Sequence, residues 1–299
     1  MLEAPGGRRI RYLRLSVTGR CQLACVYCGE AEGGDSPLSP SDFGRLAEVA
    51  LSLGIYNFRI TGGEPLLRED LPEIVGRISK LGPGDLSLTT NGIELSDSAR
   101  DLRRAGLRRV NIGLPALDRE LYLRMTGVDA LDRALEGVDA ALREGLLPVK
   151  VNVVLVRGMN DSQVEDFVRF SKEKGVVVRF IEVMPFGIED GLVPADEVLK
   201  RLGPGEDVEV VGSGPAEYFR RDGALVGLIT PITRPFCERC DRLRVTAEGK
   251  LVPCITSDFG EDMVRAIGEG KIEEAFRRVV KYKPLRYGTF HGSMRLIGG

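Results

Sequence analysis

The chain has very little histidine. His291 is the only one among 299 residues. A catalytic triad with a histidine base, or a zinc site built from several histidines, is therefore nearly excluded. Any acid–base or metal chemistry has to come from other side chains.

Long apolar runs are also missing. No run approaches the roughly 18 residues of a membrane-spanning helix, and the N-terminus lacks the apolar core of a secretory signal. We therefore expect a cytoplasmic protein without membrane association. Neither sign of charge dominates, since the chain has 42 Lys and Arg residues and 44 Asp and Glu residues. Overall charge thus argues neither for nor against an anionic ligand, and no nucleic-acid partner is expected.

Cysteine is scarce, and its six copies fall into two distant groups of three: Cys21, Cys25 and Cys28, then Cys237, Cys240 and Cys254. In a cytoplasmic chain, cysteines are typically metal ligands or catalytic thiols rather than disulfide partners. For the first group, three unrelated buried thiols are the alternative.

The first group follows an apolar run at residues 13–17, in the stretch CQLACVYC. Thiolates this close together, on a loop that leaves a strand, can converge on one metal centre. Three ligands for a four-iron cluster leave one iron open to a substrate or a second cofactor.

The second group has the spacing C-x2-C-x13-C. Zinc is one alternative, but a structural zinc site is normally closed by a fourth ligand. No fourth cysteine is available, and the histidine lies far downstream. A second cluster with one open iron is the better interpretation.

Short β-rich segments alternate with amphipathic stretches from Ile10 onward. Six predicted strands cover residues 13–17, 58–61, 86–89, 110–114, 149–155 and 177–182. Predicted helices cover residues 40–54, 71–81, 96–105, 131–144 and 162–174. This alternation predicts a parallel sheet with right-handed crossovers, and six units fall short of the eight in a closed barrel. The predicted fold is an α/β, incomplete (β/α)6 barrel of the TIM type, with a flat doubly wound sheet as the alternative.

The remaining segments are less regular. Residues 1–9 are predicted to form a loose arm, and residues 187–214 break into Gly, Pro and acidic residues. A strand at 224–230 and helices at 261–268 and 272–282 follow. We divide the chain into a barrel domain, residues 1–220, and a C-terminal region, residues 221–299, that carries the second cluster and closes the barrel's open side.

The second predicted strand ends in Thr61-Gly62-Gly63-Glu64-Pro65. Paired glycines let the backbone approach a ligand closely, and their N–H and C=O groups can bind an amino acid's carboxylate and ammonium. A tight turn without a ligand would need the same residues.

Taken together, C-x3-C-x2-C with an aromatic residue before its last cysteine and the GGEP turn resemble the radical S-adenosylmethionine (SAM) superfamily. The second group, Arg-Leu-Arg at 242–244 and the terminal Gly-Gly narrow the resemblance to the GTP 3′,8-cyclase family. That family is associated with the first step of molybdenum cofactor biosynthesis.

The resemblance implies two [4Fe-4S] clusters, one on each cysteine group. The first would bind SAM and the second the guanine base of GTP. A radical derived from SAM would remove hydrogen from C3′ of GTP, and C3′ would then attack C8. The implied partners are an electron donor and, downstream, cyclic pyranopterin monophosphate synthase; a homodimer is also compatible with the resemblance.

Matching positions carry implied roles. Those for cofactor contact are Tyr27, Gly63, Gly113 and Met184. Those for substrate contact are Arg14, Arg59, Thr89, Lys150, Arg179, Arg242, Leu243 and Arg244, of which Arg242 and Arg244 are also assigned to catalysis. Arginine suits a triphosphate because its planar fork binds phosphate oxygens in pairs. A solvated surface charge is the alternative for any one of these arginines.

The chain also departs from the family pattern. Asn57 stands where a lysine is usual, which questions one phosphate contact. Gly113 and Pro115 replace a serine and an aspartate, and Gln22 and Asp241 replace asparagines. None of these changes touches a cysteine. The Gly298-Gly299 tail is expected to reach the catalytic pocket, with plain terminal disorder as the alternative.

Two other functions stay open from the sequence: a radical enzyme that modifies a peptide, and a non-enzymatic iron–sulfur protein for electron transfer or sensing. The first would bind a peptide rather than GTP. The second would leave the GGEP turn and the arginines without a role.

Overall fold

The computed structural model describes residues 1–29, 33–188, 190–210, 214–290 and 294–297. His291 and the Gly298-Gly299 tail lie outside the described residues, so the prediction for the tail stays untested.

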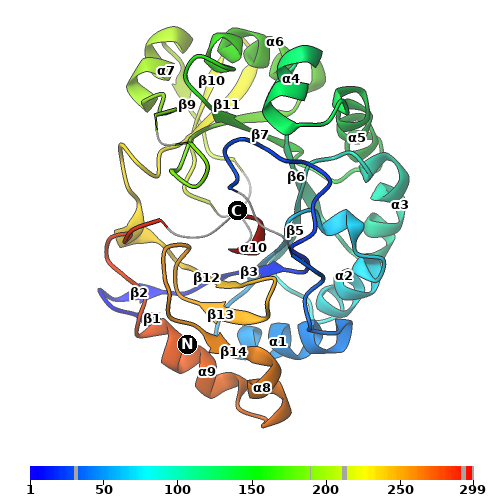
Figure 1. Cartoon of the computed structure of the whole chain (residues 1–299), viewed down its shortest axis with the longest axis vertical. Coiled ribbons are helices and arrows are strands. Elements are labelled where there is room, and N and C mark those ends of the chain that lie inside the picture. The colour runs from blue at the N-terminus through cyan, green and yellow to red at the C-terminus, as the bar shows by residue number, and fades with distance from the viewer. Residues whose placement is uncertain (30–32, 189, 211–213, 291–293, 298–299) are drawn as a thin grey trace.

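One curved sheet of twelve strands organises the molecule. Its order is β14-β13-β12-β3-β4-β5-β6-β7-β8-β11-β10-β9, and every pairing from β12 to β11 is parallel. The helices cover the outside of this sheet, and the ring of strands stays open (Figure 1). The predicted incomplete barrel is confirmed.

The six predicted strands are present within a residue or two of their expected bounds. They are β3 (Tyr12–Ser16), β4 (Asn57–Thr61), β5 (Asp85–Thr90), β6 (Arg109–Gly113), β7 (Lys150–Leu155) and β8 (Val177–Glu182). The five predicted helices between them correspond to α1 (Pro40–Ser52), α2 (Leu71–Ser79), α3 (Leu95–Ala105), α5 (Leu131–Arg143) and α6 (Val164–Lys174).

Three further α-helices were not predicted: α4 (Arg119–Thr126), α7 (Ala195–Leu202) and α10 (Met294–Ile297). The first two have eight residues and α10 has four, so each gives a weak periodic signal. α7 also lies inside the Gly- and Pro-rich stretch, between Pro194 and Gly203.

The C-terminal part of the chain extends both open edges of the barrel. β12 (Arg242–Val245) pairs with β3, and β11 (Ala224–Ile229) pairs with β8. Antiparallel strands complete each edge: β13 (Lys250–Val252) and β14 (Glu261–Asp262) on one side, β10 (Glu217–Arg221) and β9 (Glu206–Asp207) on the other. α8 (Met263–Gly268) and α9 (Ile272–Val280) follow, and α10 (Met294–Ile297) is last.

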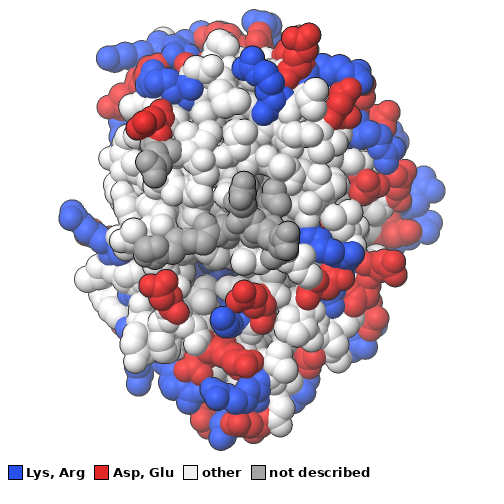
Figure 2. All heavy atoms as spheres, viewed as in Figure 1, with Lys and Arg blue, Asp and Glu red and all other residues white. Residues whose placement is uncertain are grey.

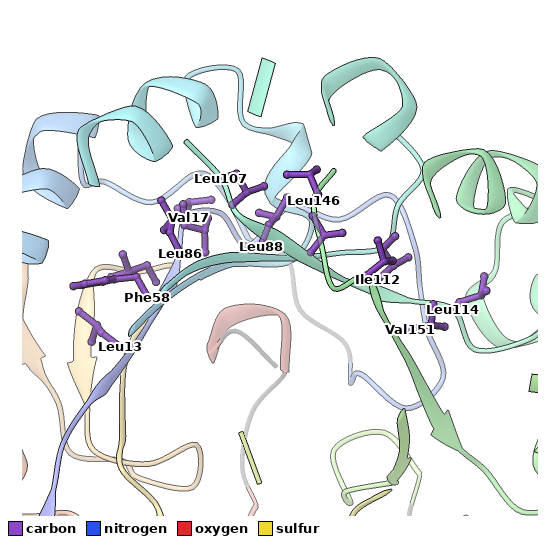
Figure 3. Packing of buried hydrophobic residues seen from close by; sticks show 14 of the residues in the cluster. Leu13, Val17, Phe58, Leu86, Leu88, Leu107, Ile112, Leu114, Leu146 and Val151 are labelled. Carbon is purple, nitrogen blue, oxygen red and sulfur yellow. The ribbon is translucent and has the colours of Figure 1, made fainter. Parts of the chain in front are cut away.

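Alternation along the strands sorts side chains between two environments. Outward residues such as Leu13, Phe58 and Leu88 are fully buried beneath the helices (Figure 3). Inward residues are mostly polar, because successive side chains of a strand point to opposite faces. The apolar core therefore lies between sheet and helices, and the barrel's interior is left for charged groups.

The prediction of a loose N-terminal arm is wrong. β1 (Glu3–Ala4) and β2 (Arg8–Arg9) form a small hairpin, and Leu2 and Ala4 are buried. The guanidinium of Arg8 donates to the carbonyl oxygens of Pro5, Cys237, Lys283 and Pro284. Apolar contacts and this set of acceptors order the segment.

Figure 2 shows charged side chains gathered mostly over the outer helices of this face. Within the described part of the chain, no helix combines the length and apolarity that crossing a bilayer would require.

Replacing Phe58 with alanine should lower the free energy of unfolding by about 3–5 kcal/mol, because a fully buried ring leaves a cavity between sheet and helices. Tyr56, which directly precedes β4, is 51% exposed and serves as the control. Its alanine variant should change stability by about 0.5 kcal/mol at most. Urea denaturation of both variants checks this, and equal losses would contradict the packing described.

Candidate active site

A single cavity of about 350 Å³ brings the two cysteine groups together. All six cysteines line it, although the groups stand far apart in the sequence. The first group follows β3, and the second lies around β12 and β13. Because these strands are neighbours in the sheet or pair with neighbours, the fold itself places both groups at one space.

The first cysteine loop is held against α4. The N–H groups of Ala24 and Val26 donate to the carbonyls of Thr126 and Met125, at 2.7 and 3.0 Å. A turn from the Cys28 N–H to the Cys25 carbonyl, 2.9 Å, sets these two cysteines side by side. The loop is therefore shaped by α4, a helix that sequence reasoning missed.

The GGEP turn packs directly against the same loop. The N–H groups of Gly63 and Glu64 donate to Thr18 and Arg20, both at 2.7 Å. A Cβ at Gly63 would lie 2.3 Å from the carbonyl oxygen of Arg20, which no side chain can tolerate. Glycine is required here for close approach of two backbones.

Glu64 is directed into the protein rather than toward the cavity's centre. Its carboxylate accepts hydrogen bonds from Leu66 N, Thr90 Oγ1 and Asn91 N. Burial raises the pKa of Glu64 to about 7 despite these donors. The residue links the end of β4 to the end of β5 and so fixes the GGEP turn.

The second cysteine group is formed by the turn before β12 and the end of β13. The Cys240 N–H donates to the Cys237 carbonyl at 3.1 Å. Burial raises the pKa of Cys237, and the nearby sulfurs of Cys254 and Cys240 add to the effect. Burial acts the same way on Cys240, but Lys283 and Arg242 outweigh it and lower the pKa of that thiol.

The donor set fits iron–sulfur clusters. In the described part of the chain no three His, Cys, Asp or Glu side chains gather closely enough to hold one metal ion. A four-iron cluster takes each thiolate on a different iron, so its three sulfurs lie farther apart than the ligands of one metal ion. The thiols of both groups line one cavity, which agrees with this wider spacing.

The barrel's interior carries buried cations. Register places Arg14 between Arg244 and Arg59 on adjacent strands. Burial lowers the pKa of Arg14, and it lowers those of Arg59 and Arg244 to about 10; neighbouring arginines contribute to each shift. Charges that repel one another in a buried site indicate that an anion binds there.

Arg179 and Lys150 extend this cationic layer. Arg179 donates to Asn152 Oδ1 and Asn111 Oδ1, at 2.9 and 2.8 Å, and these hydrogen bonds fix the orientation of its guanidinium group. Lys150 donates to the hydroxyl of Tyr218 at 3.2 Å. Burial lowers the pKa of Lys150 to about 7, with Arg179 as the next cause.

Most predicted site residues line the cavity. Besides the cysteines, they are Arg14, Tyr27, Arg59, Gly63, Thr89, Gly113, Arg179, Met184, Arg242 and Arg244. Lys150 and Leu243 do not line it. The side chain of Leu243 is fully buried in the apolar core because its neighbours on β12 point inward. Any contact of Leu243 with substrate would have to use its main chain.

Of the residues that depart from the family pattern, Gly113 and Pro115 line the cavity and Asn57 does not. The amide of Asn57 donates to the Arg11 carbonyl at 3.2 Å, and Asn57 does not line the cavity. Gly113 does line it, and a Cβ there would have only one heavy atom within 4 Å, Thr90 O at 3.8 Å. Pro115 borders the same space.

Several cavity residues escaped the sequence reading, among them Tyr12, Asn91, Asn152 and Phe236. Strict alternation along the strands would have found Tyr12 and Asn152. Tyr12 Oη, Asn91 Nδ2 and Thr89 Oγ1 are buried without a hydrogen-bond partner among the described atoms. Such groups are normally satisfied, so these atoms are candidates to bind a ligand.

α10 covers part of the site. Its Met294 N–H donates to the Cys28 carbonyl at 3.0 Å, and its Leu296 carbonyl accepts from the Ala247 N–H at 2.8 Å. The helix therefore connects the first cysteine loop to the turn between β12 and β13.

Comparison with known proteins identifies the family. Residues 15–171 match the Radical SAM superfamily, and residues 176–289 match Molybdenum Cofactor Synthesis C. A GTP 3′,8-cyclase of Geobacter sulfurreducens is 42% identical over 302 residues, covering 94% of this chain and 92% of that protein. One from Thermodesulfovibrio yellowstonii is 40% identical over 290 residues, covering 91% and 90%. The chain belongs to the GTP 3′,8-cyclase family.

Membership in the GTP 3′,8-cyclase family confirms the predicted enzyme class and the predicted cofactors, SAM and [4Fe-4S] clusters. Solved structures support the fold. Streptococcus suis SuiB bound to the precursor peptide SuiA has a TM-score of 0.66 at 15% identity, over 90% of this chain and 67% of that one. Native anSMEcpe with bound AdoMet has a TM-score of 0.53 at 18% identity, over 64% and 58%.

Replacing Gly63 with alanine should displace the first cysteine loop and so remove the iron of the first cluster, while the second cluster stays bound. Gly268→Ala is the control, because a Cβ there meets nothing within 4 Å. Iron content after anaerobic reconstitution measures the effect. Full iron loading of Gly63→Ala would show that the close approach to Arg20 does not shape the loop.

Proposed function

We propose that the chain converts GTP to (8S)-3′,8-cyclo-7,8-dihydroguanosine 5′-triphosphate, the first step of molybdenum cofactor biosynthesis. The observation that carries the proposal is the cavity that is lined by both cysteine groups and by the buried arginines Arg14, Arg59 and Arg179. A radical source and a nucleotide site have to meet within one enclosed space for this reaction, and the cavity provides one.

The first cluster is assigned to Cys21, Cys25 and Cys28, and SAM to the space beside it. The N–H of Gly63 already donates to Thr18, so Gly63 offers its main-chain carbonyl to the ammonium of SAM. Tyr27, Gly113 and Met184 border the same cavity. When bound and reduced, this cluster supplies the electron that cleaves SAM and starts radical chemistry at the ribose of GTP.

Cys237, Cys240 and Cys254 would hold the second cluster, which would offer a binding site for the guanine of GTP. The triphosphate is assigned to Arg14, Arg59 and Arg179, which line the cavity, and to Lys150, which does not line it but is repelled by Arg179. A bound polyanion would relieve the repulsion among these cations. The buried hydroxyl of Thr89 would form a hydrogen bond with the ligand.

Arg242 and Arg244 are assigned to the reacting part of GTP. The guanidinium of Arg242 lies 5.2 Å from the ring centroid of Phe236, which restrains its orientation. With GTP held at both ends, these residues keep C3′ and C8 in position and exclude water from the reacting atoms. Leu243 contributes at most its main chain.

The remaining assignments are also proposals. We infer an electron donor, cyclic pyranopterin monophosphate synthase as the next enzyme, and a homodimer. A reducing cytoplasmic location suits six cysteines that form no disulfide. The division into residues 1–220 and 221–299 is retained as a proposal.

The decisive experiment incubates the anaerobically reconstituted protein with reductant, SAM and GTP, and follows products by mass spectrometry. We expect 5′-deoxyadenosine together with a cyclised isomer of GTP. Cys28→Ser should abolish cleavage of SAM, and persistence of cleavage in that variant would refute the assignment of the first cluster. Slow 5′-deoxyadenosine formation with GTP unchanged would point to another substrate, such as a peptide.

Binding of GTP should weaken as pH rises above 7. The pKa of Lys150 is about 7 without ligand, so above that pH binding must return a proton to the amine. The affinity for GTP should fall by about tenfold per pH unit until the pH reaches the pKa of Lys150 in the complex with GTP.

Lys150→Arg is the matched variant, because arginine stays charged throughout this range. Calorimetric titration of both proteins from pH 6 to 9 measures the difference, and ionisation of GTP itself affects both equally. Parallel curves for the two proteins would show that Lys150 does not bind the triphosphate.

A further inference from the structure

We propose that Lys283 is a positioning residue of the second cluster, which holds the three cysteine segments together and stabilises the reduced form of the cluster. The proposal deepens the assignment of that cluster to Cys237, Cys240 and Cys254 and rests on it. Lys283 belongs to neither cysteine motif and lies three residues after the end of α9 at Val280.

Lys283 is almost completely buried, with 3% of its surface exposed. Its Nζ donates to the carbonyl oxygens of Arg242 at 2.6 Å and Pro253 at 3.0 Å, and it forms a hydrogen bond with the sulfur of Cys240. An ammonium has three N–H donors, and these three acceptors use all of them.

The positions of the acceptors give the lysine its role. Arg242 begins β12 two residues after Cys240, and Pro253 directly precedes Cys254. One ammonium therefore joins the two chain segments that carry Cys240 and Cys254. Removing the amine would remove the hydrogen bonds that connect these two segments.

Arg8 connects the third cysteine to the same lysine. Its Nη1 donates to the carbonyls of Cys237 and Pro284, at 2.8 and 3.0 Å, and its Nη2 donates to the carbonyl of Lys283 at 3.0 Å. The N-terminal hairpin thus fixes the backbone of Lys283 and of Cys237 together.

The segment after Lys283 supplies donors to the other sulfurs. The main-chain N–H of Tyr287 is hydrogen-bonded to Cys237. The hydroxyl of Thr256 lies 3.4 Å from the sulfur of Cys254 and accepts from the Gly288 N–H at 3.1 Å. All three thiolates therefore meet polar groups that residues 283–288 provide or orient.

These contacts have a predictable electrostatic effect. A cluster with three thiolate ligands becomes more negative when it takes up an electron. A buried positive charge and hydrogen bonds to the sulfurs favour that reduced form, and they are recognised determinants of cluster potentials. Loss of the charge alone should therefore lower the reduction potential.

The test uses the full-length chain with Cys21, Cys25 and Cys28 replaced by serine, so that only the second cluster is present. In this background Lys283→Met should shift the equilibrium at least tenfold toward the oxidised cluster, or about 59 mV for a one-electron couple. Redox titration with dithionite and mediators, followed by electron paramagnetic resonance, measures the shift.

Two controls separate charge from shape. Lys283→Arg keeps the charge and should retain most of the wild-type potential. Lys281→Met removes an exposed lysine two residues away and should leave the potential unchanged. An unchanged potential in Lys283→Met, or an equal shift in Lys283→Arg, would overturn the proposal.

The iron content of each variant distinguishes a loss of the cluster from a change in its reduction potential. Loss of iron in Lys283→Met with retention in Lys283→Arg would support the proposal, and loss in both would show that only the shape of lysine matters. If the serine background itself binds no iron while the wild-type chain carries one cluster, the second-cluster assignment fails, and that result is distinguishable from a failure at Lys283 alone.

Discussion

Buried positive charge is the constraint on which the structure depends. Arg14, Arg59, Arg179 and Lys150 face the inside of a barrel whose outer face is packed with aliphatic side chains. Burying cations without a partner is costly, and it is tolerated where other groups hold them and a ligand neutralises them. Asn111 and Asn152 fix the fork of Arg179, and Tyr218 contacts Lys150. The interior is thus preorganised for a polyanion at some expense to the stability of the empty protein.

The two cysteine groups depend on different kinds of support. The first rests on a close backbone contact, in which the N–H groups of Gly63 and Glu64 donate to Thr18 and Arg20 and Gly63 leaves no room for a side chain. The second is held by long charged side chains from distant parts of the chain, Arg8 and Lys283. The first group is also held by α4 and by Met294 of α10, whereas the second is held mainly by residues from the two ends of the chain.

Sequence alone predicted the central strands and seven of the helices, α8 and α9 included, and the family resemblance supplied almost all of the cavity's cationic side chains. Periodicity served well for the strands, because strands buried on one face alternate regularly. It failed for α4 and α7, which are too short for a clear period, and for residues 1–9, whose order comes from contacts with residues 237–284. Arg8 and Lys283 carry no local signal at all. Their importance arises from main-chain acceptors that the fold brings to them.

The parallel pairing of β12 with β3 and of β11 with β8 has a consequence for synthesis of the chain on the ribosome. While the N-terminal six strands emerge, β3 and β8 remain edges with unpaired main-chain groups, and such edges invite association with other chains. The partner of β8 emerges with residue 224, but the partner of β3 arrives only with residue 242. A nascent chain that stalls between these points would present the apolar strand that leads to the first cysteine loop.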